Sequence, residues 1–141
     1  QDVIPPANVI ERLLTNKKDA CSAVYFHHVR SNPQWIGQRQ VAVQDLVPVA
    51  YARGIRQGEA VQLSFDQTVP ARVQEVFFAG LGCMLISRNV LEKISFRFEE
   101  GKPAFDDAYF GADCTAHGLK QYLDSHVVCA HHARPWKEES Q

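Results

Sequence analysis

The sequence predicts a mixed α/β fold in which helices cover a sheet, and three observations lead to this prediction. Runs of the kind found in buried strands recur along the chain, at residues 20–27, 75–86 and 121–129. Segments with helical periodicity or end signals lie between them, at residues 9–14, 88–94 and 106–117. The chain has 141 residues, which is enough for one domain with a substantial core.

The first predicted helix follows Pro5-Pro6, a pair that can open a helix. Asn8 and Glu11 have the spacing of a capping box, and the apolar residues from Val9 to Leu14 fall on one helical face. The strand at residues 20–27 shows no strict alternation of apolar and polar residues. It is therefore predicted to be buried on both faces.

The middle segment, residues 29–74, contains several prolines and glycines between short apolar runs. This pattern predicts short strands and long loops, with a hairpin near residues 49–65. Loops set on a rigid scaffold often carry specificity, so the segment is expected to hold information about an acceptor.

The remaining elements have clearer signals. Residues 75–86 are expected to form one buried strand interrupted by glycines, after which Ser87 caps the helix at 88–94. The helix at 106–117 begins with two acidic residues, which suits the helix dipole, and Gly118 is expected to end it.

Composition excludes several classes of function. The formal net charge is −1 and the cations are scattered, which argues against nucleic acid as a partner. No apolar stretch approaches the ~20 residues of a membrane span, and no signal peptide is visible. The four cysteines form no Cys-x-x-Cys pair. They are therefore expected to be reduced thiols in a cytoplasmic protein, largely buried, and a zinc site built from them would lack the usual spacing.

Four groups of residues carry possible chemistry. The first is Asp2, which precedes an apolar pair and Pro-Pro and is either a surface residue or a carboxylate presented to a metal in a cleft. The second is Asp106-Asp107, which is either the acidic first turn of a helix or the source of a general base acting on a hydroxyl.

The third group is His131-His132, which follows a buried strand and is either an exposed loop or a source of a metal-binding imidazole. His27-His28 raises the same question at the end of another strand. The fourth group, Gly80-Leu81-Gly82, is too short for a phosphate loop and indicates a tight backbone passage beside a ligand.

The order and spacing of these groups resemble a known family. The segment from Asp2 resembles the last Asp of a D-x-D motif that runs into V/I-P-P and a helix ending in Leu-Leu. The residues from Gly80 are similar to G-x-G-C-x-L-I-x-R-x-V-x-E-K-I. Further matches are E/D-D-x-x-F, G-x-K-x-Y-x-D and a terminal C-G-H, at residues 106–110, 118–124 and 129–131. Together the chain resembles the C-terminal half of family 2-like glycosyltransferases.

The resemblance implies a partial GT-A-like mixed sheet with flanking helices. It implies that Asp2 and His131 bind a divalent cation, Mn or Mg, or contact a diphosphate. Asp106 or Asp107 would be the catalytic carboxylate, with Asp107 matching the more constant position. Gly80, Leu81 and Gly82 would line the donor sugar and the acceptor. Two departures are mild, since Asp106 stands where Glu is common and Ala130 replaces a glycine.

The resemblance also implies that residues 1–141 correspond to the metal- and acceptor-binding half alone. The nucleotide-binding βαβ half and the first Asp of D-x-D would precede Gln1. The expected partners are a nucleotide sugar and a sugar or other hydroxyl acceptor, with little activity from the chain alone. The alternative is a non-catalytic half-domain that self-associates as a homodimer or binds a partner through an exposed strand edge. A Cys/His zinc protein is a third interpretation.

Overall fold

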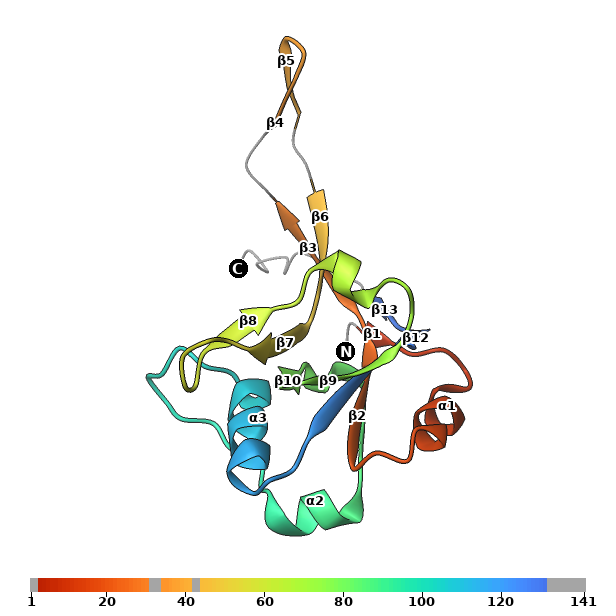
Figure 1. Ribbon diagram of the computed structural model, residues 1–141, viewed down its shortest axis with the longest axis vertical. Helices are drawn as coiled ribbons and strands as arrows, with labels where there is room; N and C mark the ends of the chain where they lie inside the picture. The colour runs from red at the N-terminus through yellow and green to blue at the C-terminus, as the bar shows by residue number, and fades with distance from the viewer. Residues whose placement is uncertain (1–2, 31–33, 42–43, 132–141) are drawn as a thin grey trace, which may run out of the picture.

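The computed structural model describes residues 3–30, 34–41 and 44–131, and shows a mixed α/β fold of several small sheets and few helices (Figure 1). The helices in this part of the chain are α1 (Val9–Thr15), α2 (Arg88–Lys93) and α3 (Asp106–Ala116). Two short 3-10 turns accompany them, η1 (Phe65–Thr68) and η2 (Leu81–Cys83). The predicted fold class is thus confirmed at the level of mixed α/β.

The largest sheet has four strands in the order β11-β2-β12-β9. These strands are β2 (Ala20–Val24), β9 (Val73–Val76), β11 (Met84–Ile86) and β12 (Gln121–Val128). The long strand β12 runs parallel to β2, whereas β11 and β9 are antiparallel to their neighbours. The sheet is therefore mixed, with β2 and β12 at its centre.

The other strands form small antiparallel sheets. Three of them, in the order β10-β7-β8, are β10 (Phe78–Ala79), β7 (Ala50–Arg53) and β8 (Ala60–Gln62). The paired ribbons are β3 (Phe26–Arg30) with β6 (Gln44–Pro48), β4 (Gln34–Ile36) with β5 (Arg39–Val41), and β1 (Val3–Ile4) with β13 (Ala130–His131). Figure 1 shows the β3–β6 ribbon rising from the body of the molecule with β4 and β5 at its far end.

Strand β2 is buried along its whole length, as its sequence predicted. Its odd-numbered residues Cys21 and Ala23 pack with Leu13 of α1, while Val24 packs with Leu123 and residues of the three-stranded sheet. Successive side chains of a strand point to opposite faces, so β2 contributes to a core on each side of the sheet. A third cluster joins α2 to α3 through Val90.

Several local predictions are confirmed. The hairpin near residues 49–65 is the antiparallel pair β7–β8. The Ser87 side chain accepts a hydrogen bond from Val90 N–H at the start of α2, and Gly118 follows α3 with a φ of 67°. Three predictions are wrong. The strand expected at residues 20–27 ends at Val24, and the chain continues after Tyr25 as β3 in another sheet. Asn8 makes no side-chain capping hydrogen bond, and residues 75–86 form parts of three strands because the chain turns at Gly80 and through η2.

The four cysteines are free thiols, and three of them, Cys21, Cys114 and Cys129, are buried while Cys83 is half-buried. Burial raises the pKa of Cys129 to about 12, with the neighbouring Cys83 thiol adding to the shift. Among the described residues, no helix is long and apolar enough to cross a membrane.

Candidate functional site

Tyr25 lies between β2 and β3 and connects several of the groups that the sequence singles out. Its side chain is 7% exposed, and its hydroxyl accepts a hydrogen bond of 3.1 Å from the Gly82 backbone N–H. A Cβ atom at Gly80 would come within 2.8 Å of the Tyr25 ring and 2.7 Å of Val49. Glycine is therefore required here because the backbone passes directly over the tyrosine.

The second glycine of this segment is equally constrained. A Cβ atom at Gly82 would lie 2.9 Å from the Tyr25 ring and 2.9 Å from the Val3 side chain of β1. Leu81, between the two glycines, instead packs against the cluster around Val90. The backbone passage is tight, as predicted, and the groups that its two glycines approach are protein side chains, chiefly Tyr25, while the Leu81 side chain packs into the core.

His131, the last described residue of the chain, lies beside the same tyrosine. Strand β13 pairs with β1 so that the Cα atom of His131 lies opposite that of Val3. The His131 and Tyr25 rings meet edge to face, with centroids 5.5 Å apart. The β1–β13 ribbon thus places His131 beside Tyr25 and Val3 beside Gly82.

The ring nitrogen Nδ1 of His131 lies 2.9 Å from the carbonyl oxygen of Phe26. A carbonyl oxygen only accepts hydrogen bonds, so in the neutral ring this contact places the proton on Nδ1 and leaves a lone pair on Nε2. Histidines that bind metals commonly have this arrangement, because the second hydrogen bond fixes the tautomer and the orientation of the ring.

A second histidine stands next to His131. The ring of His27 lies 4.7 Å from that of His131, again edge to face. Burial lowers the pKa of His27, and the neighbouring His131 lowers it further. Both His27 and His28 are exposed, but it is the His27 ring that meets His131, because neighbouring residues of a strand point to opposite faces.

Asp107 reaches the site from helix α3. Half-buried Asp107 shares one helical stripe with Phe110, Gly111 and Cys114, which are buried. Gly111 allows α3 to lie directly on β10, because a Cβ atom there would come within 3.0 Å of the Phe78 ring. Asp107 is one turn before Gly111 and so faces the same layer.

The electrostatic surroundings of Asp107 differ from those of its neighbour. Burial raises the pKa of Asp107, its hydrogen bond from the Ala108 N–H opposes this, and the charge of Asp106 adds to the rise. Asp107 in turn is close enough to add to the rise that burial causes in the pKa values of Tyr25 and Tyr51. Asp106 is exposed, so Asp107 is the carboxylate of the pair that belongs to the site.

Of the two predicted metal ligands, the structure describes His131. Asp2 lies outside the described residues. Within residues 3–30, 34–41 and 44–131, no three His, Cys, Asp or Glu side chains are grouped to hold a metal ion. His131 with its free Nε2 is the available ligand, so the described part of the chain offers one position and no closed cage.

Two tyrosines of this site were missed by reasoning from the sequence. Tyr25 falls at the end of a predicted strand and Tyr51 within a predicted hairpin, where aromatic residues are common. Nothing in the pattern distinguishes them from other strand residues. Their role depends on which distant segments, namely residues 80–82 and α3, come to lie against them.

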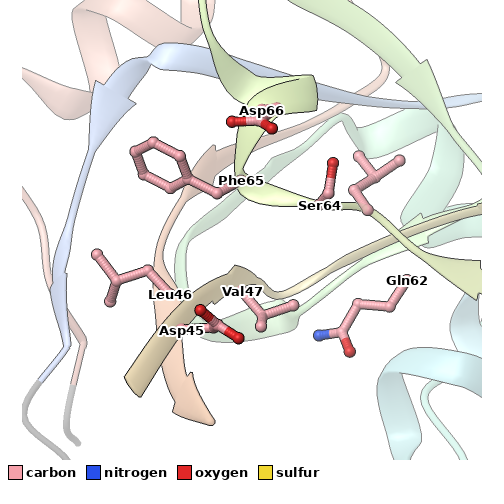
Figure 2. A pocket seen from close by; sticks show the side chains of 8 residues that line it. Asp45, Leu46, Val47, Gln62, Ser64, Phe65 and Asp66 are labelled. Atoms are coloured by element: carbon pink, nitrogen blue, oxygen red, sulfur yellow. The ribbon is translucent and has the colours of Figure 1, made fainter. Parts of the chain in front are cut away.

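The structure also has a hollow that Tyr25 does not line, between β6 and the segment from the end of β8 through η1 (Figure 2). Its volume is about 690 Å³. Its lining residues are Asp45, Leu46, Val47, Gln62, Leu63, Ser64, Phe65 and Asp66. We refer to it as the β6 cavity.

Comparisons with known proteins give no match. No family model, no curated protein and no solved structure is detectably similar to this chain.

Proposed function

We propose that this chain forms the metal- and acceptor-binding part of a glycosyltransferase, which moves a sugar from a nucleotide-sugar donor to an acceptor hydroxyl. The observation that carries the proposal is convergence on Tyr25. Gly82, His131 and Asp107 are far apart in the sequence, yet the first two contact Tyr25 and the third acts on its pKa. These are positions for which the family resemblance implies functional roles.

In this proposal Asp107 is the general base. Its carboxylate is half-buried, and among the described residues no Lys or Arg forms an ion pair with it. A carboxylate with a raised pKa accepts a proton more readily at neutral pH than an ordinary one. Asp107 would take the proton of the acceptor hydroxyl as that oxygen attacks the anomeric carbon of the donor.

The proposal includes a divalent cation, Mn or Mg. When bound, such an ion neutralises charge on the diphosphate leaving group. His131 can bind a cation of this kind, because Nε2 of its neutral ring keeps a lone pair. Cations of this class are commonly bound by one or two protein ligands together with substrate phosphates, so a closed protein cage is not required. His131 and Asp2 would hold it.

Thermal unfolding of the whole chain tests this proposal. A nucleotide diphosphate that binds the native state stabilises it, so Tm should rise with UDP or GDP only when Mn²⁺ is also present. His131→Ala should abolish the rise, while Asp107→Asn should retain it and lose any sugar transfer or donor hydrolysis. Asp106→Asn, which changes the exposed neighbouring carboxylate, is the control and should lose much less activity than Asp107→Asn. Absence of any metal-dependent shift would contradict the proposal.

One observation favours a second candidate, a non-catalytic module that self-associates. Strand β11 is an edge strand whose only described neighbour is β2, and α1 beside it exposes Ile10 at 62% and Leu14 at 58%. An unpaired strand edge next to apolar surface favours pairing with a second copy. Sedimentation would show a dimer that Ile10→Asp converts to a monomer, with no stabilisation by metal and nucleotide.

A further inference from the structure

We propose that the β6 cavity is a saccharide-binding subsite that holds a part of the acceptor remote from the reacting hydroxyl. This inference rests on the proposed function, because it assigns the acceptor to a place on the same chain. Its binding step can nevertheless be measured without donor or metal.

The size of the β6 cavity suits a small ligand. Its volume of about 690 Å³ falls within the roughly 300–1,000 Å³ typical of small-molecule sites. Figure 2 shows two sides of the cavity, with Asp45, Leu46 and Val47 of β6 on one and Ser64, Phe65 and Asp66 on the other. A single bound ion would leave most of this space unfilled.

The walls are fixed before any ligand arrives. Gln62 Nε2 donates to the Pro48 carbonyl at 3.1 Å, and Leu63 N–H donates to the Ala50 carbonyl at 2.9 Å. Within the second wall, Ser64 N–H donates to Gln67 Oε1 at 2.8 Å. These bonds hold both walls in place, so a ligand would not have to order them, which favours affinity.

The lining combines apolar surface with hydrogen-bond acceptors. Phe65 is 43% exposed and Leu46 is 40% exposed, and together they offer an apolar surface of the kind against which the C–H face of a sugar ring packs. The carboxylates of Asp45 and Asp66 have no hydrogen-bond or ion-pair partner among the described residues, although both line the cavity. Carboxylates accept strong hydrogen bonds from hydroxyl groups.

The negative charge of the cavity favours an acceptor saccharide over the nucleotide-sugar donor. Its lining holds two carboxylates and no Lys, Arg or His. A diphosphate would be repelled there, so the nucleotide sugar is excluded and an uncharged or amino saccharide is favoured. One strand pair connects the cavity to the Tyr25 site, because Val47 in its wall pairs with His27, whose ring meets that of His131 edge to face.

Binding at a remote subsite has a kinetic meaning. Contacts to a part of the substrate away from the reacting atoms help to position the hydroxyl that reacts. An acceptor long enough to fill the β6 cavity should therefore be a better substrate than a monosaccharide that cannot reach it.

The test is a nuclear magnetic resonance titration of the whole chain, without donor or metal. The probes are methyl glucoside, methyl galactoside, N-acetylglucosamine, lactose and cellobiose, each raised to high millimolar concentration, with spermidine as a cationic probe. At least one saccharide should shift the backbone signals of residues 45–47 and 62–66. The double variant Asp45→Asn/Asp66→Asn should weaken its binding at least tenfold.

A matched control removes two exposed carboxylates elsewhere, through Glu11→Gln/Glu100→Gln, and should leave saccharide binding unchanged. Phe65→Leu keeps an apolar side chain and should bind more weakly while remaining folded. The inference is overturned if no saccharide shifts these residues, or if only spermidine does. Saccharide binding without any Mn²⁺-dependent rise in Tm by UDP or GDP would contradict the proposed function alone, whereas saccharide binding that is unchanged in the Asp45/Asp66 variant would contradict the subsite alone.

Discussion

Replacing Gly111 by alanine should destabilise the protein, although alanine favours helices. The new Cβ atom would lie 3.0 Å and 3.1 Å from two ring atoms of Phe78 and closer still to its Cβ. Ordinary carbon contacts are about 3.5–4.0 Å. Phe78 cannot move away easily, because it is buried and stacks on Tyr51 with ring centroids 4.5 Å apart.

The magnitudes decide the sign. Alanine at a helix interior gains about 1 kcal/mol over glycine, whereas forcing extra volume into a packed layer costs about 1–3 kcal/mol. The Gly111 contact involves the Cβ atom of Phe78, which is fixed to the backbone, so the cost lies at the upper end. We expect a net loss of roughly 1–2 kcal/mol in the free energy of unfolding.

Denaturant unfolding measures this difference directly. The matched control is Ala112→Gly at the next position, which is exposed and should lose only the ~1 kcal/mol of helix propensity. Gly111→Ala should also displace Asp107 from the tyrosines, so the pKa of Tyr25 should fall toward its ordinary value. An alanine variant more stable than the wild type would refute the argument that α3 needs this close approach.

Three further predictions follow from single groups. Burial raises the pKa of Asp107, so the native state binds a proton on this carboxyl more tightly than the unfolded state does. The stability that this gives is present at low pH and is lost as the pH rises through the folded pKa. Asp107→Asn should therefore stabilise the protein at pH 7 and have little effect below the ordinary carboxyl pKa, as pH-dependent unfolding would show; equal effects at both pH values would contradict this. Burial and the adjacent Cys83 raise the pKa of Cys129 to about 12, so iodoacetamide at about pH 8 should leave Cys129 unmodified until the protein unfolds. Mass spectrometry of the labelled chain measures this, and modification of Cys129 in the folded protein would contradict the prediction. Ser87→Ala removes the hydroxyl that accepts from Val90 N–H and should cost about 1 kcal/mol in denaturant unfolding; an unchanged midpoint would show that this cap contributes nothing.

Local patterns in the sequence predicted the elements whose signals are themselves local. The buried strand β2, the helix α3 with its acidic first turn, and the Ser87 cap each depend on residues a few positions apart. Such signals survive folding because neighbouring residues are positioned by the same backbone geometry. They place Asp106 and Asp107 correctly in the first turn of α3, whereas His131, expected after the last strand, lies in β13.

The sequence could not predict how the glycine segment behaves. Residues 75–86 have an apolar pattern that suits one buried strand, but Gly80 and Gly82 allow the chain to turn over Tyr25. The close contact of Gly80 with Tyr25 joins segments more than fifty positions apart in the printed sequence. The periodicity of a sequence does not report such long-range packing. For this reason it predicts one strand over residues 75–86, where the structure has parts of β9, β10 and β11.

The same reason explains what was missed at the candidate site. The residues alone do not distinguish Asp106 from Asp107, and although the resemblance favours Asp107, it is the packing of α3 on β10 that shows Asp107 facing inward. The β6 cavity likewise arises where η1 comes to lie across from β6. Neither feature has a local signal in the printed residues.

The most direct test of the proposed function is a paramagnetic relaxation measurement on the whole chain. Mn²⁺ should be added with UDP or GDP while the histidine ring and backbone amide signals are followed. The proposal predicts selective broadening of the signals of His131, His27 and Gly82, and its loss in His131→Ala. Broadening of the distant His117 or His126, with the His131 signals unchanged, would contradict it.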